Sequence, residues 1–360
     1  AYEFGLITYD EYRRYYRRKY DELYVKKIES RYSQNQKKKV IRKKVNPVII
    51  HNVYQCLKDC CSLSEHHRLS LIRDRKISLE RIEQDYFTCP TNWRQKDTII
   101  ARIKEKYPAY TDEILMNIPG FFYDKKRGKL SFTGHKGLGI LIRNSDSRIV
   151  AIQIRKDTIQ EGDSRYIWFS SSFATYNPDE YNGGNGCGSP KDVCYPQMLK
   201  KHTLCITEGR FKSEKLTESG NISISVQGVT SWHGIEETIK HMNGIHNVFI
   251  FFDADILGKH VLFMQSEKMI RKLQDEFPGL YIRYAFWSKK NGKGIDDCII
   301  AGNISKVKYY EAKRAAEICN DAYTHALGEY HVANLRELKQ ERAKEFEDYL
   351  QILTESMLGL

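Results

Sequence analysis

Between Thr203 and about Asn303, short runs of apolar residues alternate with longer stretches in which apolar residues recur every three or four positions. The short runs predict buried strands, and the periodic stretches predict amphipathic helices. The strands are expected at 203–207, 222–226, 248–252 and 281–287, and the helices at 211–219, 234–243 and 260–277. Strands and helices that alternate in this way form a parallel sheet with right-handed crossovers.

The hydrophobic pattern changes several times along the chain, and these changes divide it into five segments. Residues 1–46 predict a helical arm that runs into a basic linker, and residues 47–120 show the spacing of short helices. Residues 121–202 contain β-branched runs joined by turns, which predicts a β-rich subdomain. Residues 203–303 form the alternating unit, and residues 304–360 predict a helical tail. The expected fold class is therefore α/β, with a parallel sheet and flanking helices preceded by helical and β-rich subdomains.

The helical arm (residues 1–46) carries most of the excess positive charge. It holds 14 Lys and Arg against 6 Asp and Glu, in a chain whose net charge is +12. Four of its arginines lie between tyrosines at helical spacing: Arg13, Arg14, Arg17 and Arg18. Guanidinium groups neutralise phosphates and aromatic rings stack on unpaired bases, so the arm predicts contact with nucleic acid. The alternative is a solvated helix whose tyrosine stripe packs on the rest of the protein.

Composition narrows the class of protein. The 360 residues are 41% hydrophobic, which is enough for a sizeable core. No apolar run approaches the length of a membrane span, and the polar, tyrosine-rich N-terminus is unlike a signal peptide. The nine cysteines are scattered and odd in number, which favours free thiols and a cytoplasmic location. A basic chain of this kind predicts an acidic partner, nucleic acid before a membrane surface.

Acidic residues follow the predicted strands at the points where the strands end. Glu208 ends the first strand, Asp253 and Asp255 follow the third, and Asp296 and Asp297 follow the fourth. In a parallel sheet these carboxyl ends share one edge, and two aspartates two residues apart can face the same way. Converging carboxylates repel one another unless a cation lies among them. Hard oxygen ligands suit Mg²⁺ or Mn²⁺, so the pattern predicts a divalent metal site.

Two short motifs carry a family resemblance. "ITEG" followed by "FFDAD" resembles the Toprim fold, which bacterial primases share with type IA and type II topoisomerases and some nucleases. Upstream, "LIRDRKISLERIEQDYF" and "KLSFTGHKGLGILIRNSDSRIVAIQIRKD" are similar to segments of the polymerase core of bacterial-type primases. Topoisomerases do not carry that β-rich passage. The resemblance covers the chain from Glu65 to Asn303.

The resemblance implies roles for the acidic residues. Glu208 matches the Toprim glutamate, which is assigned to general acid–base catalysis or to metal binding. Asp253 and Asp255 match the metal-binding Asp-x-Asp pair. Asp296 and Asp297 match the trailing acidic positions.

Two basic residues also take a role from the resemblance. Arg155 falls on the basic position ahead of the Toprim unit, where template or nucleotide phosphates would lie. Many primases have an aspartate four residues after the Toprim glutamate, whereas this chain has Lys212, which would face the triphosphate or the template. Toprim replication proteins of phages and mobile elements often carry that lysine, so the chain is most similar to that branch.

The resemblance implies a primase-like nucleotidyltransferase with Mg²⁺ or Mn²⁺ as its cofactor. It would make short primers on single-stranded DNA from nucleoside triphosphates, in the replication of a phage or mobile element. A replicative helicase is then a candidate partner. Two alternatives stay open: a Toprim nuclease that cleaves DNA with the same carboxylates, and a non-catalytic DNA-binding replication module. A topoisomerase fits less well, because no region resembles a domain that would supply a tyrosine nucleophile.

Overall fold

A computed structural model describes residues 45–360, except 161, 162 and 201. The described fold is that of the compact unit Val45–Leu360, which the contacts separate from residues 1–44. The predicted nucleic-acid contacts of Arg13, Arg14, Arg17 and Arg18 lie outside the described residues and stay a prediction.

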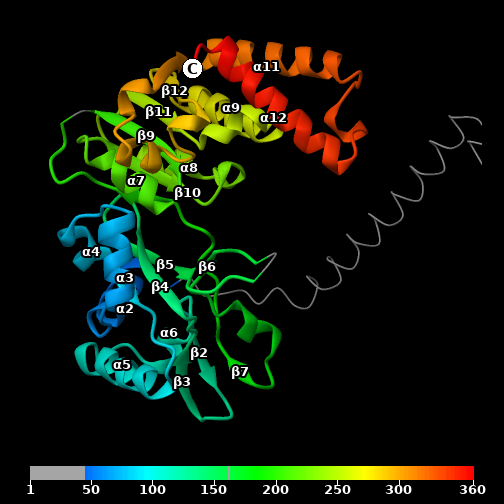
Figure 1. Ribbon diagram of the computed structural model, residues 1–360. Helices are drawn as coiled ribbons and strands as arrows, with labels where there is room; N and C mark the ends of the chain where they lie inside the picture. Colours follow the sequence, from blue (N-terminus) through cyan, green and yellow to red (C-terminus); the bar gives the residue numbers. More distant parts are fainter. Residues whose placement is uncertain (1–44, 161–162, 201) are drawn as a thin grey trace, which may run out of the picture. The chain divides into compact units, whose positions relative to one another are not determined.

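A six-stranded sheet forms the half of this unit that carries the acidic residues (Figure 1). In sheet order its strands are β13 (Lys308–Glu311), β12 (Tyr281–Phe286), β11 (Asn247–Phe251), β9 (Thr203–Glu208), β10 (Ile222–Val226) and β8 (Asp192–Cys194). The four central strands are parallel, and the two edge strands are antiparallel to their neighbours. The parallel strands are those that the apolar runs predicted.

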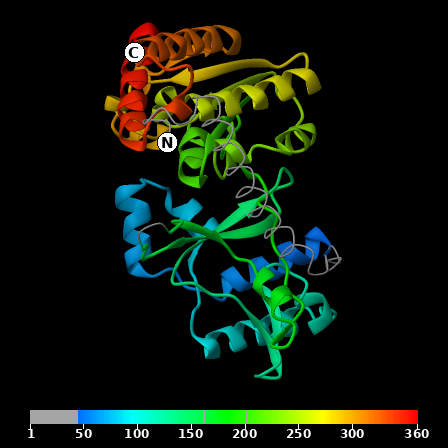
Figure 2. The ribbon, with the colours of Figure 1, turned by 90° about the vertical axis from the view of Figure 1, so that its right-hand side faces the viewer.

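Helices cover both faces of this sheet (Figures 1 and 2). On one face lie α8 (Ile235–Lys240), α9 (His260–Glu276) and α11 (Ala312–Glu329), and on the other lie α7 (Arg210–Thr217) and α10 (Ile295–Ile300). Successive residues of β9 show why both faces must be covered. Leu204 and Ile206 are fully buried in one apolar cluster, and Cys205 between them is buried in the other. A strand buried on both sides reads as a continuous apolar run, which is the pattern of a covered parallel sheet.

The segment 304–360 differs in part from the predicted helical tail. It begins with the strand β13, continues with α11 and ends with α12 (Gln340–Met357), and the two helices are separated by residues 330–339. β13 pairs with β12, with Tyr310 opposite Tyr284. The strand forms because the free edge of β12 offers hydrogen bonds to the tyrosine-rich sequence "KYYE", which has a high β-propensity.

The other half of the unit contains the predicted helices and the predicted β-rich passage. Its helices are α2 (Pro47–Asp59), α3 (Glu65–Leu69), the π-helix η1 (Ser70–Asp74), α4 (Leu79–Asp85), α5 (Trp93–Lys106) and α6 (Asp112–Leu115). One antiparallel sheet has the order β1 (Tyr86–Thr88), β4 (Gly137–Arg143), β5 (Ile149–Lys156), β6 (Tyr166–Trp168). A smaller one has the order β3 (Lys129–Phe132), β2 (Phe121–Asp124), β7 (Tyr181–Asn182).

A buried ionic cluster joins the sheet of β4 to the six-stranded sheet. Arg210, at the start of α7, contacts the carboxylates of Asp85, Asp192 and Glu214 at 2.5, 3.0 and 2.8 Å. Its guanidinium also donates to the carbonyl of Leu141 in β4 at 3.2 Å. All four charged side chains are at most 4% exposed. We call these four residues the Arg210 cluster.

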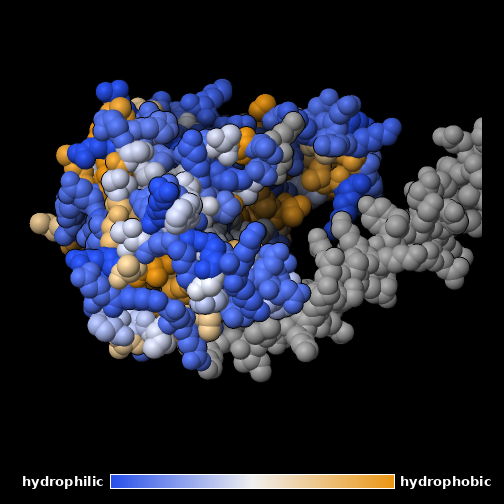
Figure 3. All heavy atoms as spheres, turned by 90° about the horizontal axis from the view of Figure 1, so that it is seen from below, coloured by the Kyte–Doolittle hydropathy of each residue, from blue (hydrophilic) through white to orange (hydrophobic). Residues whose placement is uncertain are grey.

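Two surface features bear on the predicted environment of the protein. None of the helices in the described part of the chain is long and apolar enough to cross a membrane. On the face shown in Figure 3, hydrophilic side chains predominate and apolar side chains gather only in small groups.

Candidate functional site

The ends of β9 and β11 bring the first two predicted acidic residues to one edge of the sheet. Phe251 of β11 pairs with Thr207 of β9, so the two parallel strands end at the same level. Glu208 is the last residue of β9, and Asp253 lies two residues after the end of β11. Gly209 then turns the chain into α7. Its φ is 81°, a backbone conformation that residues with a Cβ atom rarely adopt.

A cavity of about 560 Å³ lies at this edge. It is lined by polar, charged and aromatic residues from both halves of the unit, among them Arg75, Tyr166, Trp168, Glu208, Lys212, Asp253, Lys293, Asp296 and Asp297. Predicted acidic residues that follow three strands (β9, β11 and β12) therefore share a cavity with five cationic side chains: Arg75, Arg165, Arg210, Lys212 and Lys293.

Lysines lie directly among the carboxylates. The Nζ atom of Lys212 is 2.5 Å from Oδ1 of Asp253, and the Nζ atom of Lys259 is 2.8 Å from Oδ2 of Asp255. A third amine, that of Lys293, is 3.5 Å from Asp255 and 3.9 Å from Asp253. Each aspartate of the Asp-x-Asp pair thus has an ammonium group as its counter-charge.

The charges and burial of the site shift several of its pKa values. Burial, reinforced by Asp253, raises the pKa of Glu208. Burial alone would raise the pKa of Asp255 as well, but Lys259 and Lys293 hold it below its usual value. Burial would lower the pKa of Lys212, and Asp253 overcomes this and raises it. Lys212 is therefore held in its charged form, whereas Glu208 takes up a proton more readily than an ordinary glutamate.

Asp296 and Asp297, the two acidic residues that follow β12, make different contacts. Asp296 is buried, and its Oδ2 accepts a hydrogen bond from Nη1 of Arg75 at 3.1 Å. Burial and the neighbouring Asp297 raise the pKa of Asp296. Asp297 is exposed and accepts from the backbone N–H of Gly294 at 3.1 Å, which caps the start of α10. Both aspartates line the cavity, but only Asp296 forms an ion pair across the two halves of the unit.

Arg155 lies on β5, opposite Tyr166 of β6 and Leu138 of β4. Of the described residues that line the cavity, β5 contributes Gln153 rather than Arg155. Arg155 is therefore two residues away from a lining residue, Gln153, but does not itself line the cavity.

Among the described residues, three cations that pair with the predicted aspartates were not predicted from the sequence: Arg75, Lys259 and Lys293. Lys259 had a local signal, because it follows Asp255 by four residues. Arg75 and Asp296 are 221 positions apart in the sequence, and no local sequence pattern predicts a contact between them.

The donor atoms of Glu208 and Asp253 suit a divalent cation, because both side chains line the cavity and offer hard carboxylate oxygens. Asp255 is not among the described residues that line the cavity. Within the described residues, however, no three Asp, Glu, His or Cys side chains are gathered closely enough to hold a metal ion. The lysine contacts account for this spacing, since each aspartate is turned towards an ammonium group.

Comparisons with known proteins bear on the fold. A family model described as a domain of unknown function (DUF3854) matches residues 195–305. No curated protein matches the sequence. Among solved structures, the chain is similar to the RNA polymerase domain of Mycobacterium tuberculosis primase DnaG, with 14% identity and a TM-score of 0.54, over 84% of this chain and 97% of that chain.

Two further solved structures agree with that match. The zinc-binding and RNA polymerase domains of the Aquifex aeolicus primase are 12% identical with a TM-score of 0.51, over 91% of this chain and 79% of that chain. The M. tuberculosis domain in complex with double-stranded DNA is 13% identical with a TM-score of 0.51, over 86% of this chain and 98% of that chain. The chain therefore has the mixed α/β fold of primase catalytic cores.

Proposed function

We propose that this protein is a Toprim-type, primase-like nucleotidyltransferase that makes short primers on single-stranded DNA from nucleoside triphosphates. The observation that carries the proposal is the meeting of Glu208 and Asp253 in a cavity that also holds Arg75, Lys212 and Lys293. Carboxylates could hold a divalent cation there, and the amines and guanidinium could hold a triphosphate. The primase-like fold supports this assignment, and Lys212 favours service in the replication of a phage or mobile element.

The proposal gives each side chain a role. Glu208, Asp253 and Asp255 would hold Mg²⁺ or Mn²⁺, which when bound lowers the pKa of an attacking 3′-hydroxyl and neutralises charge on the transferred phosphoryl group. Lys212 would leave Asp253 and contact the triphosphate. Arg155 would contact template phosphates outside the cavity lining.

Arg75 and Lys293 would add positive charge to the cavity. Arg75 holds Asp296 at 3.1 Å, and Asp296 and Asp297 begin the helix α10 beside Lys293. Both cations line the cavity that a nucleotide would occupy. The solved M. tuberculosis domain bound to double-stranded DNA supports nucleic acid as the partner class.

One test decides whether the protein makes primers. Full-length protein is incubated with single-stranded DNA, the four ribonucleoside or deoxyribonucleoside triphosphates and Mn²⁺, and the products are separated by length. We expect short oligonucleotides that depend on both template and triphosphates. Cleavage of the DNA without synthesis would replace the proposal with a nuclease.

The lysine contacts also favour a second candidate function, the non-catalytic DNA-binding module. Ammonium groups at 2.5 and 2.8 Å from Asp253 and Asp255 already neutralise the carboxylates without a metal. In the same assay, tight DNA binding with neither synthesis nor cleavage would select this alternative.

Substitution of Lys212 by Met should make Mn²⁺ bind more tightly. A positive charge 2.5 Å from Asp253 competes with the metal, and its removal should lower the Mn²⁺ dissociation constant by about tenfold or more. Electron paramagnetic resonance of free Mn²⁺ measures the change. Lys272→Met is the matched control, because Lys272 pairs with Glu276 at 3.5 Å on α9, among residues that do not line the cavity. Unchanged affinity in Lys212→Met would show that the lysine does not compete with the metal.

A further inference from the structure

The C-terminal helix α12 contacts the loop that carries the Asp-x-Asp pair. The 3₁₀ helix η4 (Ala254–Gly258) begins directly after Asp253 and contains Asp255. Gln351 of α12, 8% exposed, donates from Nε2 to the carbonyl of Ala254 at 3.0 Å. Its Oε1 accepts from the backbone N–H of Gly258 at 2.8 Å. A single side-chain amide thus binds both ends of η4.

We propose that Gln351 is a positioning residue that fixes Asp253 and Asp255 in the geometry of the site, so that the C-terminal helix is a part of the functional centre. This inference rests on the proposed function only where it concerns metal binding. It assigns a task to a segment that the sequence presents simply as a helical tail.

The close approach of α12 to η4 depends on a glycine in η4, Gly258. A Cβ atom at Gly258 would lie 2.5 Å from the carbonyl oxygen of Glu347 and 3.1 Å from Cβ of Gln351. Only glycine lets α12 come this near, and the near approach is what allows the amide of Gln351 to reach the backbone of η4. The hydroxyl of Thr354, one turn further along, is 3.4 Å from the carbonyl of Leu257.

The residue between the two aspartates is held on both of its peptide groups. Its N–H, that of Ala254, donates to the carbonyl of Lys293 at 2.9 Å, and its carbonyl accepts from Gln351. Ala254 is therefore hydrogen-bonded through its N–H to the loop that contains Lys293, and through its carbonyl to α12. The side chains of Asp253 and Asp255 project from this fixed backbone.

A second residue of α12 extends the same network to the other cavity loop. Glu355 accepts from Nε2 of Gln351 at 2.7 Å, from the hydroxyl of Ser288 at 2.7 Å and from the backbone N–H of Lys289 at 3.0 Å. Burial would raise the pKa of Glu355, but these donors lower it, so the carboxylate is held ionised. Ser288 and Lys289 begin the loop that leads to Lys293, so α12 holds both loops.

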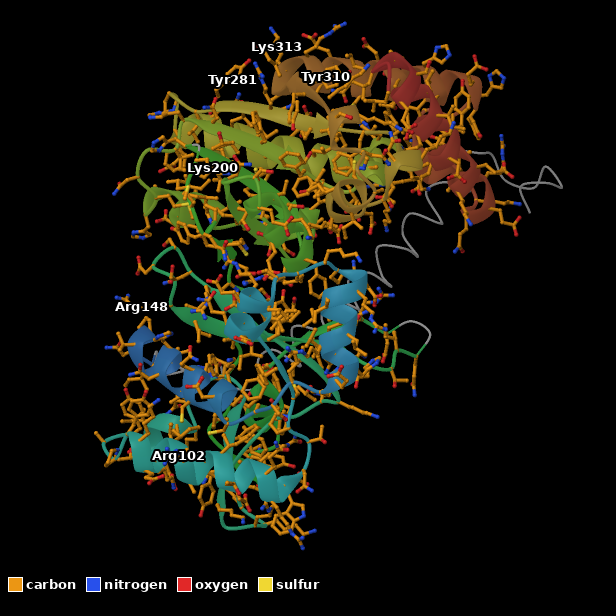
Figure 4. The ribbon with its side chains drawn as sticks, turned by 60° about the vertical axis from the view of Figure 1, so that its left-hand side comes forward. Arg102, Arg148, Lys200, Tyr281, Tyr310 and Lys313 are labelled. Atoms are coloured by element: carbon orange, nitrogen blue, oxygen red, sulfur yellow. The ribbon has the colours of Figure 1, made fainter. Side chains whose placement is uncertain are left out.

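The rest of α12 is anchored independently of the acidic loop. Phe346 and Leu350 are buried against Ala322 and Ala326 of α11. At its end, Tyr310 of β13, labelled in Figure 4, donates its hydroxyl to the carbonyl of Leu358. These contacts let the packing of α12 be weakened without touching η4, which provides a control.

The experiment compares Gln351→Leu with Leu350→Ala in the full chain. Three quantities are measured: the melting temperature, amide hydrogen exchange of residues 253–259, and the dissociation constant for Mn²⁺. In Gln351→Leu we expect exchange in this segment to be about tenfold faster or more, because the Gly258 amide loses its acceptor. We also expect the Mn²⁺ dissociation constant to rise about tenfold. In Leu350→Ala we expect a lower melting temperature with neither of the other two changes.

Each outcome decides the inference. Equal exchange in the two variants would overturn it, because Gln351 would then act only through general packing. Faster exchange with unchanged Mn²⁺ affinity would overturn the link between the loop and the metal ligands. If the unmodified protein binds no Mn²⁺ through Asp253, the proposed function fails, whereas the exchange comparison still shows whether Gln351 holds the loop.

Discussion

Substitution of Asp253 by Asn is expected to reduce primer synthesis by about a thousandfold or more, while the protein stays folded. The carboxylate is proposed as a metal ligand, and its loss removes several kcal/mol of transition-state stabilisation. Synthesis is measured as template-dependent oligonucleotide formation with Mn²⁺ at saturating substrate. Asp275→Asn is the control, because Asp275 is an exposed carboxylate on α9, away from the cavity lining. A fully active Asp253→Asn protein would remove this residue from the proposed site.

The same substitution should lower the melting temperature, not raise it. Carboxylates that crowd together without a cation would relax when one of them became neutral. In the structure, however, Asp253 is paired with Lys212 at 2.5 Å, and the two side chains are only 17% and 19% exposed. A neutral amide in place of the carboxylate would leave that ammonium without its counter-charge. Because the pair is partly solvated, we expect a loss of about 1–2 kcal/mol rather than the larger cost of a fully buried pair.

The sheet was predictable because its strands are buried on both faces. The run "VFIFF" is wholly apolar, and "TLCIT" has three consecutive apolar residues, as a covered parallel strand requires. Each run stops where the chain turns. The end of an apolar run marks the carboxyl end of a strand. Glu208 and Asp253 could therefore be assigned to one edge of the sheet from the sequence alone.

The rest of the site depends on contacts that no local pattern encodes. β13 lies in a stretch with helical spacing, and it becomes a strand only because β12 offers a free edge. Lys212 was expected to face a triphosphate, and its ion pair with Asp253 depends on how far α7 stands from the end of β11. Gln351 lies 97 positions after Ala254, and a lone glutamine on an amphipathic helix carries no signal of a backbone contact.

Substitution of Arg210 by Met is expected to destabilise the protein by about 3–5 kcal/mol at neutral pH. The guanidinium is 2% exposed, and its removal leaves the buried carboxylates of Asp85, Asp192 and Glu214 with less counter-charge. Arg210 lies two residues after Glu208 and joins β4 to the start of α7. Its loss should therefore loosen the site as well as lower the free energy of unfolding.

The destabilisation should depend on pH in a definite direction. Burial raises the pKa values of Asp192 and Glu214 even with Arg210 beside them, and without it they should rise further. A carboxyl group whose pKa is raised in the folded state makes folding less favourable as the pH rises through that pKa. Arg210→Met should therefore lose more stability at pH 8 than at pH 5, where these groups are closer to their neutral forms.

Urea unfolding of both proteins at the two pH values measures the difference. Arg314→Met serves as the control, because Arg314 forms an exposed pair with Glu317, with side chains 65% and 47% exposed. Such a pair contributes less than about 1 kcal/mol, so the control should change little at either pH. If Arg210→Met cost no more than Arg314→Met, the Arg210 cluster would contribute nothing net to stability. A loss that did not vary with pH would instead show that the carboxylates keep their charge without the guanidinium, held by Arg143, which donates to Asp85 at 2.8 Å.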